Sequence, residues 1–255
     1  LLSKNKKLVL GHSRLSIIDL SKNGHQPMLS NTSRYMISYN GEIYNFKNLK
    51  KELQRFNPNI KFSGSSDTEV LVNYIEVFGI KKTLNDIKGM FAFALWDNKE
   101  EELTLARDIA GEKPLYYGYI NGNLFFASEL KAIKEKEKNL KINHDAVRLM
   151  LKYNCIPSPY SIYKNIYKVD PASFYRFKSP SSKPKTERYF SPEIKLRNNL
   201  DEKYLDRFEE LLDNSVRSQM VSDVPIGSFL SGGVDSSIIS YYMQQNSDKP
   251  INTFS

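Results

Sequence analysis

The sequence has 255 residues, 40% of them hydrophobic, and carries 37 basic against 29 acidic side chains, a formal net charge of +8. Its longest strongly apolar stretch, 90–96, is far below the roughly 18 residues that a membrane-spanning helix needs, and 1–10 lack the features of a secretory signal. The single cysteine, Cys155, cannot form an internal disulfide and is expected to be an inert packing residue. We therefore expect a cytoplasmic protein without membrane contact.

The excess of positive charge raises the question of a nucleic-acid partner. The lysines between 131 and 138 are interleaved with Glu135 and Glu137, as on a solvated surface. No RNA- or DNA-binding motif accompanies them. We expect no nucleic-acid partner, although a positive field favours anionic substrates such as nucleotides.

Short apolar runs and helical periodicities alternate along the first part of the chain. They predict strands at 7–10, 34–39, 90–96, 102–106, 115–120 and 124–127, and helices at 68–78 and 144–152. Asn121-Gly122 lies between the last two strands and favours a two-residue hairpin turn. This mixture predicts a layered α+β domain.

The pattern changes after residue 178. Prolines and lysines replace the apolar periodicity over 179–199, which predicts a linker. Asn199 and Glu202 then have the spacing of a capping box at the start of a helix over 200–216. A second domain is expected from there, with a strand at 224–230, a turn at 231–233, a helix at 236–245 and a strand from 253.

A glycine loop follows the strand expected at 224–230 and begins the next helix. It consists of Ser231, Gly232, Gly233, Val234, Asp235, Ser236 and Ser237, directly after Leu230 at the end of the strand. Glycines let a ligand approach the backbone, and the N–H groups and dipole at a helix N-terminus favour phosphate. A carboxylate would repel phosphate directly, so we expect Asp235 to hold a Mg²⁺ ion. The alternative is a plain strand-to-helix turn with Asp235 as an N-terminal helix acid.

Polar side chains suited to an amino-acid substrate occur in the first domain. Arg14 can bind an α-carboxylate, while Glu42 and Asp67 can accept hydrogen bonds from an α-ammonium group. The Asn40 amide and the Gly41 N–H can form an oxyanion hole. The structural alternatives are a surface ion pair for Arg14, a hairpin turn at Asn40-Gly41 and a helix N-cap at Asp67.

These strings together resemble the glutaminase domain of asparagine synthetase, a class II glutamine amidotransferase of the N-terminal-nucleophile fold. The glycine loop resembles the pyrophosphate loop of the ATP pyrophosphatase family. The matching strings include 12–19, 24–28, 39–45, 65–69, 107–108, 111–117 and 126–131, and they occur in the family's order. By this resemblance glutamine is bound by Arg14, Leu15, Ser16, Ile17, Ile18, Asn40, Gly41, Glu42 and Asp67, and ATP by Leu230 and the loop that follows it.

The resemblance implies a four-layer αββα glutaminase domain over 1–178 and the start of a parallel-sheet α/β ATP pyrophosphatase domain over 200–255. Glutamine, aspartate and ATP are the implied substrates, with Mg²⁺ as cofactor, and a homodimer is compatible with the family. Ammonia from glutamine would travel through a tunnel and attack β-aspartyl-AMP, which gives asparagine, AMP and pyrophosphate.

One feature of the family is not matched. Its nucleophile is an N-terminal cysteine whose α-amine acts as general base, whereas this sequence begins at Leu1 and Cys155 is internal. We expect a fragment that lacks both ends of the enzyme and is inactive alone; a natural paralogue without the nucleophile is the alternative. His12 and His25 have no visible catalytic partner and are expected to be structural.

Other functions stay open at this stage. The residues that recognise the acceptor are expected beyond Ser255, so amidation of a sugar or peptide carboxylate is also compatible with the sequence. A glutamine-sensing or scaffold protein is an alternative from another class. So is an RNA-modifying pyrophosphatase, which shares the glycine loop but gives no role to the glutamine strings.

Overall fold

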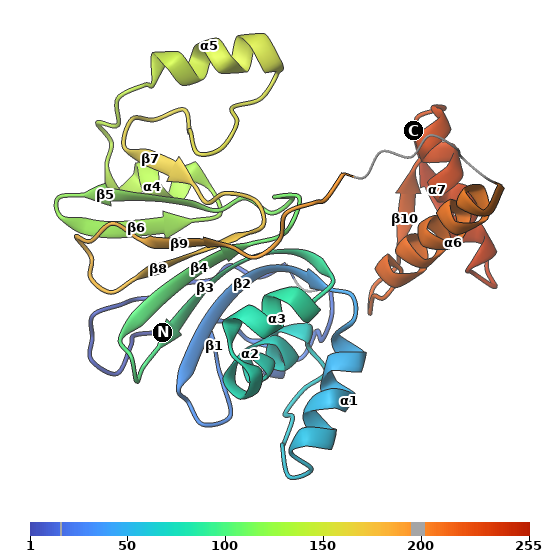
Figure 1. Cartoon of the computed structure of the whole chain (residues 1–255), viewed down its shortest axis with the longest axis horizontal. Helices are drawn as coiled ribbons and strands as arrows, with labels where there is room; N and C mark the ends of the chain where they lie inside the picture. The colour runs from blue at the N-terminus through green and yellow to red at the C-terminus, as the bar shows by residue number, and fades with distance from the viewer. Residues whose placement is uncertain (16, 195–201) are drawn as a thin grey trace. The chain divides into compact units, whose positions relative to one another are not determined.

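The computed structural model describes residues 1–15, 17–194 and 202–255. The chain divides into two compact units, shown in Figure 1. Unit 1 comprises Leu1–Arg14 and His25–Ser191, and unit 2 comprises Leu15–Gly24 and Pro192–Ser255. The chain therefore leaves unit 1 after Arg14 and re-enters it at His25.

Two antiparallel sheets form the centre of unit 1. The larger sheet has the order β1-β2-β3-β4-β8-β9, with β1 (Met28–Leu29), β2 (Tyr35–Ile43), β3 (Gly89–Asp97), β4 (Glu102–Arg107), β8 (Ser173–Phe177) and β9 (Lys185–Arg188). The smaller sheet has the order β6-β5-β7, with β5 (Tyr116–Ile120), β6 (Asn123–Ala127) and β7 (Ile166–Lys168).

Helices lie on the outer faces of both sheets (Figure 1). The larger sheet is covered by α1 (Phe46–Phe56), α2 (Asp67–Phe78) and α3 (Ile80–Asp86), with α2 packed on β1 and β2. The smaller sheet is covered by α4 (Leu130–Lys136), whose Ile133 packs against Ile120 and Ile166. A further helix, α5 (His144–Tyr153), follows. The four-layer αββα order expected for this part of the chain is therefore confirmed.

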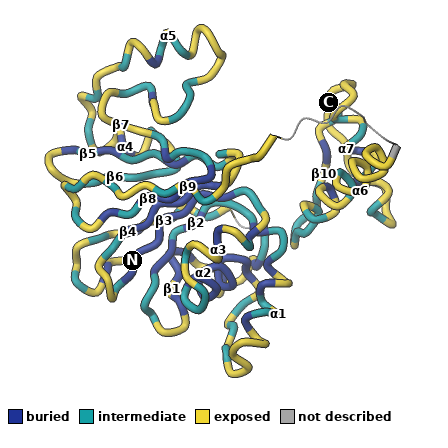
Figure 2. The backbone as a smooth tube through the Cα atoms, viewed as in Figure 1, coloured by how far each residue is buried: buried dark blue, intermediate teal, exposed yellow. Residues whose placement is uncertain are grey.

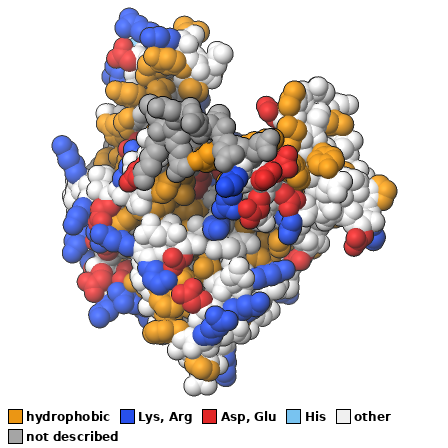
Figure 3. All heavy atoms as spheres, turned by 45° about the vertical axis from the view of Figure 1, so that its right-hand side comes forward, with side chains coloured by type: hydrophobic (Ala, Val, Ile, Leu, Met, Phe, Trp, Pro, Cys, Tyr) orange, Lys and Arg blue, Asp and Glu red, His pale blue; other side chains and the backbone are white. Residues whose placement is uncertain are grey.

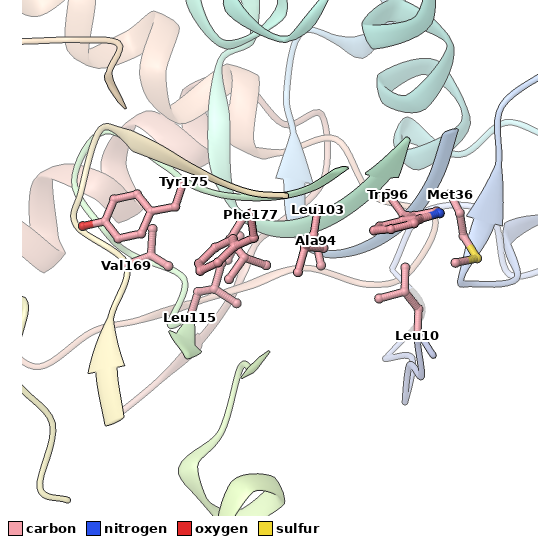
Figure 4. Close-up of a cluster of buried hydrophobic side chains, with 11 residues drawn as sticks. Leu10, Met36, Ala94, Trp96, Leu103, Leu115, Val169, Tyr175 and Phe177 are labelled. Carbon is pink, nitrogen blue, oxygen red and sulfur yellow. The ribbon is translucent and has the colours of Figure 1, made fainter. Parts of the chain in front are cut away.

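The core between the two sheets is formed by apolar side chains that occur at every second position along the strands. Ala94 and Trp96 of β3 belong to a buried cluster that also contains Leu103 of the neighbouring β4 and Leu115, the residue before β5 of the second sheet (Figure 4). Phe91 and Phe93 are also buried, on the opposite face of β3. Because β3 is buried on both faces, its sequence is continuously apolar rather than alternating, and the central strands form the darkest part of the tube in Figure 2.

Most strands and helices expected in unit 1 are present with boundary shifts of a few residues. The hairpin at Asn121-Gly122 is confirmed: both residues have positive φ, 50° and 77°, as a turn that matches the strand twist requires. The strand expected at 7–10 is wrong, because only an isolated bridge joins Leu2 to Val9. Leu10 is buried there while Val9 is 69% exposed, so this short segment packs through one side chain.

Part of the segment expected to be a linker is a strand. Residues 185–188 of the 179–199 segment form β9, which pairs with β8 at the edge of the larger sheet. An edge strand can be held by backbone hydrogen bonds alone, and charged side chains are common there. Its lack of apolar periodicity is thus explained by exposure. Asn199 of the expected capping box lies outside the described residues.

Unit 2 contains a β-α-β segment. It comprises β10 (Gly227–Phe229), α7 (Val234–Gln245) and β11 (Asn252–Phe254), and it is preceded by α6 (Glu202–Gln219), which packs on α7. Strands β10 and β11 pair in parallel, so α7 is the crossover that a parallel pair requires. The strand expected at 224–230 is shorter than predicted. Within the described part of the chain, no helix is both long and apolar enough to cross a membrane.

Candidate functional site

The proposed oxyanion residues lie near the C-terminal end of β2. Asn40 and Gly41 pair with Ala92 and Phe91 of β3, so they belong to a continuous ladder, and the hairpin-turn alternative is wrong. A Cβ atom at Gly41 would lie 2.1 Å from the Met90 carbonyl oxygen. The close approach of the two backbones, and not a turn, is why a glycine is needed here.

The polar side-chain groups of the two residues on either side of Gly41 have no hydrogen-bond or ion-pair partner among the described residues. Neither the Asn40 amide nor the Glu42 carboxylate makes a side-chain hydrogen bond or ion pair to any described residue, and both residues are half-buried. A polar group at such a position usually has a partner, either protein or water. An amide donor and a carboxylate acceptor are thus available to a ligand at this end of β2.

Asp67 is a buried carboxylate behind this strand end. Its Oδ2 accepts hydrogen bonds from the Tyr39 hydroxyl and the Ile43 N–H, both at 2.9 Å. The N-cap of α2 is Ser66, whose hydroxyl accepts the Glu69 N–H at 3.2 Å, so the N-cap alternative for Asp67 is wrong. The part played by Tyr39 was missed, since nothing in the sequence shows that its hydroxyl reaches α2.

The two acidic side chains influence each other. Burial raises the pKa of Glu42, the charge of Asp67 raises it further, and the charge of Lys113 lowers it. Burial also raises the pKa of Asp67, against the hydrogen bonds from Ile43 and Tyr39, which lower it. The structure therefore brings two expected ligands of the α-ammonium group, Glu42 and Asp67, into one electrostatic site.

Arg14 and the two histidines expected to be structural lie close together in unit 1. Burial lowers the pKa of His12, and the charges of Arg14 and His25 lower it further. The Nδ1 atom of His12 is 3.3 Å from the Ser38 hydroxyl on β2, two residues before Asn40. This contact places His12 beside the strand that carries Asn40 and Gly41, the proposed oxyanion residues, and Arg14 is close enough to His12 for its charge to act on it.

The remaining expected glutamine residues are placed differently. Leu15, Ile17 and Ile18 are grouped with unit 2, and Ser16 lies outside the described residues. In unit 2 the Ile17 carbonyl accepts the Asp223 N–H at 3.1 Å. These residues follow Arg14 directly in the sequence, so nothing in the sequence showed that they belong to a different compact unit.

The glycine loop of unit 2 joins β10 to α7. Gly232 has a φ of 80°, which favours glycine, and the loop from Ser231 to Asp235 is exposed. The first hydrogen bond of α7 runs from the Ser237 N–H to the Gly233 carbonyl at 3.1 Å, so the preceding helical N–H groups lie ahead of the ladder. The loop thus has the donors and the open access that a phosphate needs.

The hydroxyls of the loop have internal partners. Ser236 and Ser237 both donate to the Gly233 carbonyl, at 3.1 and 2.8 Å, and the Ser231 and Ser236 hydroxyls are 3.1 Å apart. Within the described residues, no group of three His, Cys, Asp or Glu side chains is arranged to hold a metal. Asp235 is exposed in the first turn of α7. A single carboxylate suits Mg²⁺ that is shared with substrate phosphates, not a metal held by protein ligands alone.

The exposure of one side chain corrects an expectation from the sequence. Cys155 is exposed, so the prediction that it is a packing residue is wrong. It follows the end of α5, where the chain is open to solvent. On the face shown in Figure 3, basic side chains are interspersed with acidic ones.

Comparison with known proteins defines the class. Residues 2–190 match the family described as "Glutamine amidotransferase domain", so the chain belongs to this family. Residues 207–255 match the family described as "Asparagine synthase".

Two similar relatives are synthetases by name. The "Putative asparagine synthetase [glutamine-hydrolyzing] 2" of Methanocaldococcus jannaschii is 38% identical over 99% of this chain and 51% of the relative. The "Asparagine synthetase [glutamine-hydrolyzing] 1" of Bacillus subtilis is 36% identical over 90% and 35%. The chain thus spans about half or less of the length of these relatives. A solved glutamine phosphoribosylpyrophosphate amidotransferase from B. subtilis gives a TM-score of 0.49 at 20% identity, covering 95% of this chain and 50% of that one.

Proposed function

We propose that the chain is the glutamine-binding part, with the beginning of the ATP-binding part, of a glutamine-hydrolysing asparagine synthetase. The observation that carries this proposal is a pair of side chains without protein partners, Asn40 and Glu42, at the end of β2. The buried carboxylate of Asp67 bonds to the same end of the strand. An amide, a backbone N–H and two carboxylates are what an amino acid with a side-chain amide requires. The names of the relatives support the same substrate.

The proposed site has three parts. Arg14, with Leu15, Ser16, Ile17 and Ile18, binds the α-carboxylate end of glutamine. Glu42 and Asp67 bind its α-ammonium group. The Asn40 amide and the Gly41 N–H stabilise the oxyanion that forms on the side-chain amide. This assignment corresponds to a domain of the N-terminal-nucleophile class that extends past the expected boundary at 178 to include β9. It is followed by an ATP pyrophosphatase domain that starts at 200.

In unit 2 we place the ATP phosphates at Leu230 and the loop from Ser231 to Ser237. Asp235 is the residue proposed to hold Mg²⁺, which would neutralise phosphate charge when bound. Aspartate as acceptor, its activation as β-aspartyl-AMP, a homodimer and a cytoplasmic location complete the proposal. The choice of aspartate rests on the relatives' names, which do not favour the alternative of a sugar or peptide acceptor.

Calorimetric titration of the chain with L-glutamine tests the proposal directly. Arg14→Ala should weaken binding by about 2–4 kcal/mol if the guanidinium holds the α-carboxylate in a buried pair. Arg55→Ala is the matched control, because Arg55 is exposed on α1. Saturable binding of L-glutamine with weaker binding of D-glutamine is expected, whereas no binding by the unmodified chain would refute the proposal.

A further inference from the structure

The outer edge of β2 carries backbone N–H groups beyond the point where its pairing with β1 ends. Strand β1 pairs with Met36 and Ile37 of β2. Further along the strand, the N–H groups of Tyr39 and Ile43 donate to side chains outside the sheet, so both point away from β3. N–H directions alternate along an antiparallel strand, and the Gly41 N–H, two residues from each of them, therefore points the same way.

The partner of Gly41 on β3 supports this direction. Phe91 is paired with Gly41, yet its N–H donates to Asp108 Oδ2 at 3.2 Å and its carbonyl accepts the Asp108 N–H at 2.8 Å. Both backbone groups of Phe91 thus face the β4 side, and Gly41 and Phe91 form a non-hydrogen-bonded pair. Within the described ranges no residue accepts the Gly41 N–H, so this donor is open on the edge of β2.

The N–H group on one side of this opening is capped by the side chain of Gln26. Its Oε1 accepts the Tyr39 N–H at 2.7 Å, and its Nε2 donates to the Thr68 hydroxyl of α2 at 3.3 Å. A backbone N–H can only donate, so the oxygen end of the amide must face β2. Gln26 is 6% exposed, and continuation of the β1–β2 register would bring it opposite Tyr39. A side-chain oxygen therefore takes the place of the backbone carbonyl that a longer β1 would supply.

Asp67 caps the N–H group on the other side of the opening. Its Oδ2 accepts the Ile43 N–H at 2.9 Å, and the residue is buried. The two capping side chains occupy the edge positions before and after Gly41, so another strand cannot pair along this edge. In the described chain one open donor remains between them, which suits a single acceptor oxygen of a small ligand.

From these contacts we infer that Gln26 is a positioning residue for the side-chain amide of glutamine, because it caps the edge of β2 next to Gly41 and keeps the Gly41 N–H open to the substrate carbonyl. This inference rests on the proposed function, in which the Gly41 N–H donates to that carbonyl. Gln26 joins the strand edge to α2, the helix that carries Asp67. It acts through the backbone of β2 and need not touch the substrate.

The test compares two ligands by calorimetry in the unmodified chain and in Gln26→Met, which removes the amide and keeps the length of the side chain. L-Norvaline has the α-carboxylate and α-ammonium groups of glutamine but no side-chain amide, so it cannot accept the Gly41 N–H. Gln26→Met should lower the preference for L-glutamine over L-norvaline about three- to tenfold, as expected for one hydrogen bond. A loss of stability alone would weaken both ligands equally, so an unchanged preference would overturn the inference.

The matched control is Gln54→Met, which makes the same chemical change at an exposed position on α1. It should keep the full preference for L-glutamine. A loss of preference as large as that of Gln26→Met would show that the effect does not depend on the edge of β2, and would overturn the inference.

A second measurement requires no ligand. In the free, unmodified chain, hydrogen exchange followed by NMR and corrected for intrinsic rates should be at least about tenfold faster at Gly41 than at Tyr39 and Ile43, which have acceptors. Gln26→Met should speed exchange at Tyr39 more than at Ile43. Equal protection of Gly41 and Tyr39, or equal changes at Tyr39 and Ile43, would overturn the inference. If the unmodified chain bound neither ligand, the proposed function would fail, but these exchange rates would still decide whether Gln26 caps this edge and leaves Gly41 open.

Discussion

The Tyr39 hydroxyl donates a hydrogen bond to Asp67 Oδ2 at 2.9 Å, and the same oxygen accepts the Ile43 N–H. A β2 side chain and a β2 backbone group thus hold one carboxylate of α2 in place. The contact ties the helix layer to the strand end that carries Asn40 and Glu42. It therefore connects the stability of unit 1 to the geometry of the proposed glutamine site.

Tyr39→Phe removes this hydroxyl and keeps the ring. The unfolding free energy should fall by about 1–3 kcal/mol, the range for a buried hydrogen bond to a charged group. The pKa of Asp67 should rise further, because one of the bonds that lower it is lost. Urea unfolding measures the first effect and ¹³C NMR the second. Tyr153→Phe, at an exposed tyrosine on α5, should change neither.

Glu42→Gln should change stability in a pH-dependent way. Burial first, and then Asp67, raises the pKa of Glu42 above its value in the unfolded chain, about 4.3. The folded protein therefore holds a proton more tightly, and stability is lost as pH rises through the raised pKa. Relative to the unmodified chain, Glu42→Gln should be more stable at pH 8, with the difference disappearing near pH 4.

Urea unfolding at several pH values checks this expectation. Glu135→Gln, at an exposed position on α4, supplies the control. If the advantage of Glu42→Gln were larger at pH 4 than at pH 8, the raised pKa would be excluded. Loss of glutamine affinity in the same variant would show that the ionised carboxylate serves binding at the expense of stability.

Gly41→Ala tests whether the close approach of β2 and β3 is essential. The new methyl group would lie 2.1 Å from the Met90 carbonyl oxygen and 2.7 Å from the Phe91 Cα atom. Both obstacles are backbone atoms, so we expect a loss of at least about 1–3 kcal/mol on urea unfolding. Gly11→Ala is the matched control, since nothing lies within 4 Å of its added Cβ atom. Equal stabilities of the two variants would contradict the geometry.

The comparison of Asn40-Gly41 with Asn121-Gly122 shows what the sequence could reveal. The same dipeptide is a hairpin turn at 121–122 but a strand interior at 40–41. The turn was predictable because strand-like runs end on both sides of it. The strand interior was not, since it depends on pairing with Ala92 and Phe91, which lie far along the chain. Long-range pairing overrides a local turn preference.

In the candidate site, too, the sequence revealed the candidate functional side chains but not the long-range contacts that hold them. Side-chain chemistry alone singled out Asn40, Glu42 and Asp67 as candidates. It did not reveal Tyr39, nor the bond between Gln26 and the Tyr39 N–H, because these contacts require the folded sheet. The α2 cap was likewise misassigned by one residue, since Ser66 and Asp67 are both good capping residues and only the backbone conformation decides between them.

In unit 2, Asp223 should hold the 15–24 segment. Its carboxylate accepts the Asp19 N–H at 2.8 Å, and its own N–H donates to the Ile17 carbonyl at 3.1 Å. Asp223→Ala should speed hydrogen exchange of the Asp19 amide about fivefold, if about 1 kcal/mol of local stability is lost. Asp223→Asn keeps an acceptor oxygen and should exchange more slowly than the alanine variant. Equal exchange in all three proteins would mean that the bond contributes nothing.

The last prediction concerns the glycine loop and its carboxylate. Asp235 lies in the first turn of α7, next to N–H groups that favour an anion, so its own charge opposes a phosphate unless a cation lies between them. Asp235→Asn should therefore reduce ATP affinity at least about tenfold when Mg²⁺ is present. Without Mg²⁺ the variant should bind ATP as well as the unmodified chain, or better, because a repulsive charge has been removed.

Calorimetric titrations with ATP, in the presence of Mg²⁺ and of EDTA, separate these effects. Asp248→Asn is the matched control, because Asp248 is also exposed in unit 2 but lies beyond the C-terminus of α7. It should retain the full response to Mg²⁺. If Asp235→Asn responded to Mg²⁺ as strongly as the unmodified chain, Asp235 would be only a helix acid. If the unmodified chain bound no ATP in either solution, the phosphate assignment of the loop itself would fail.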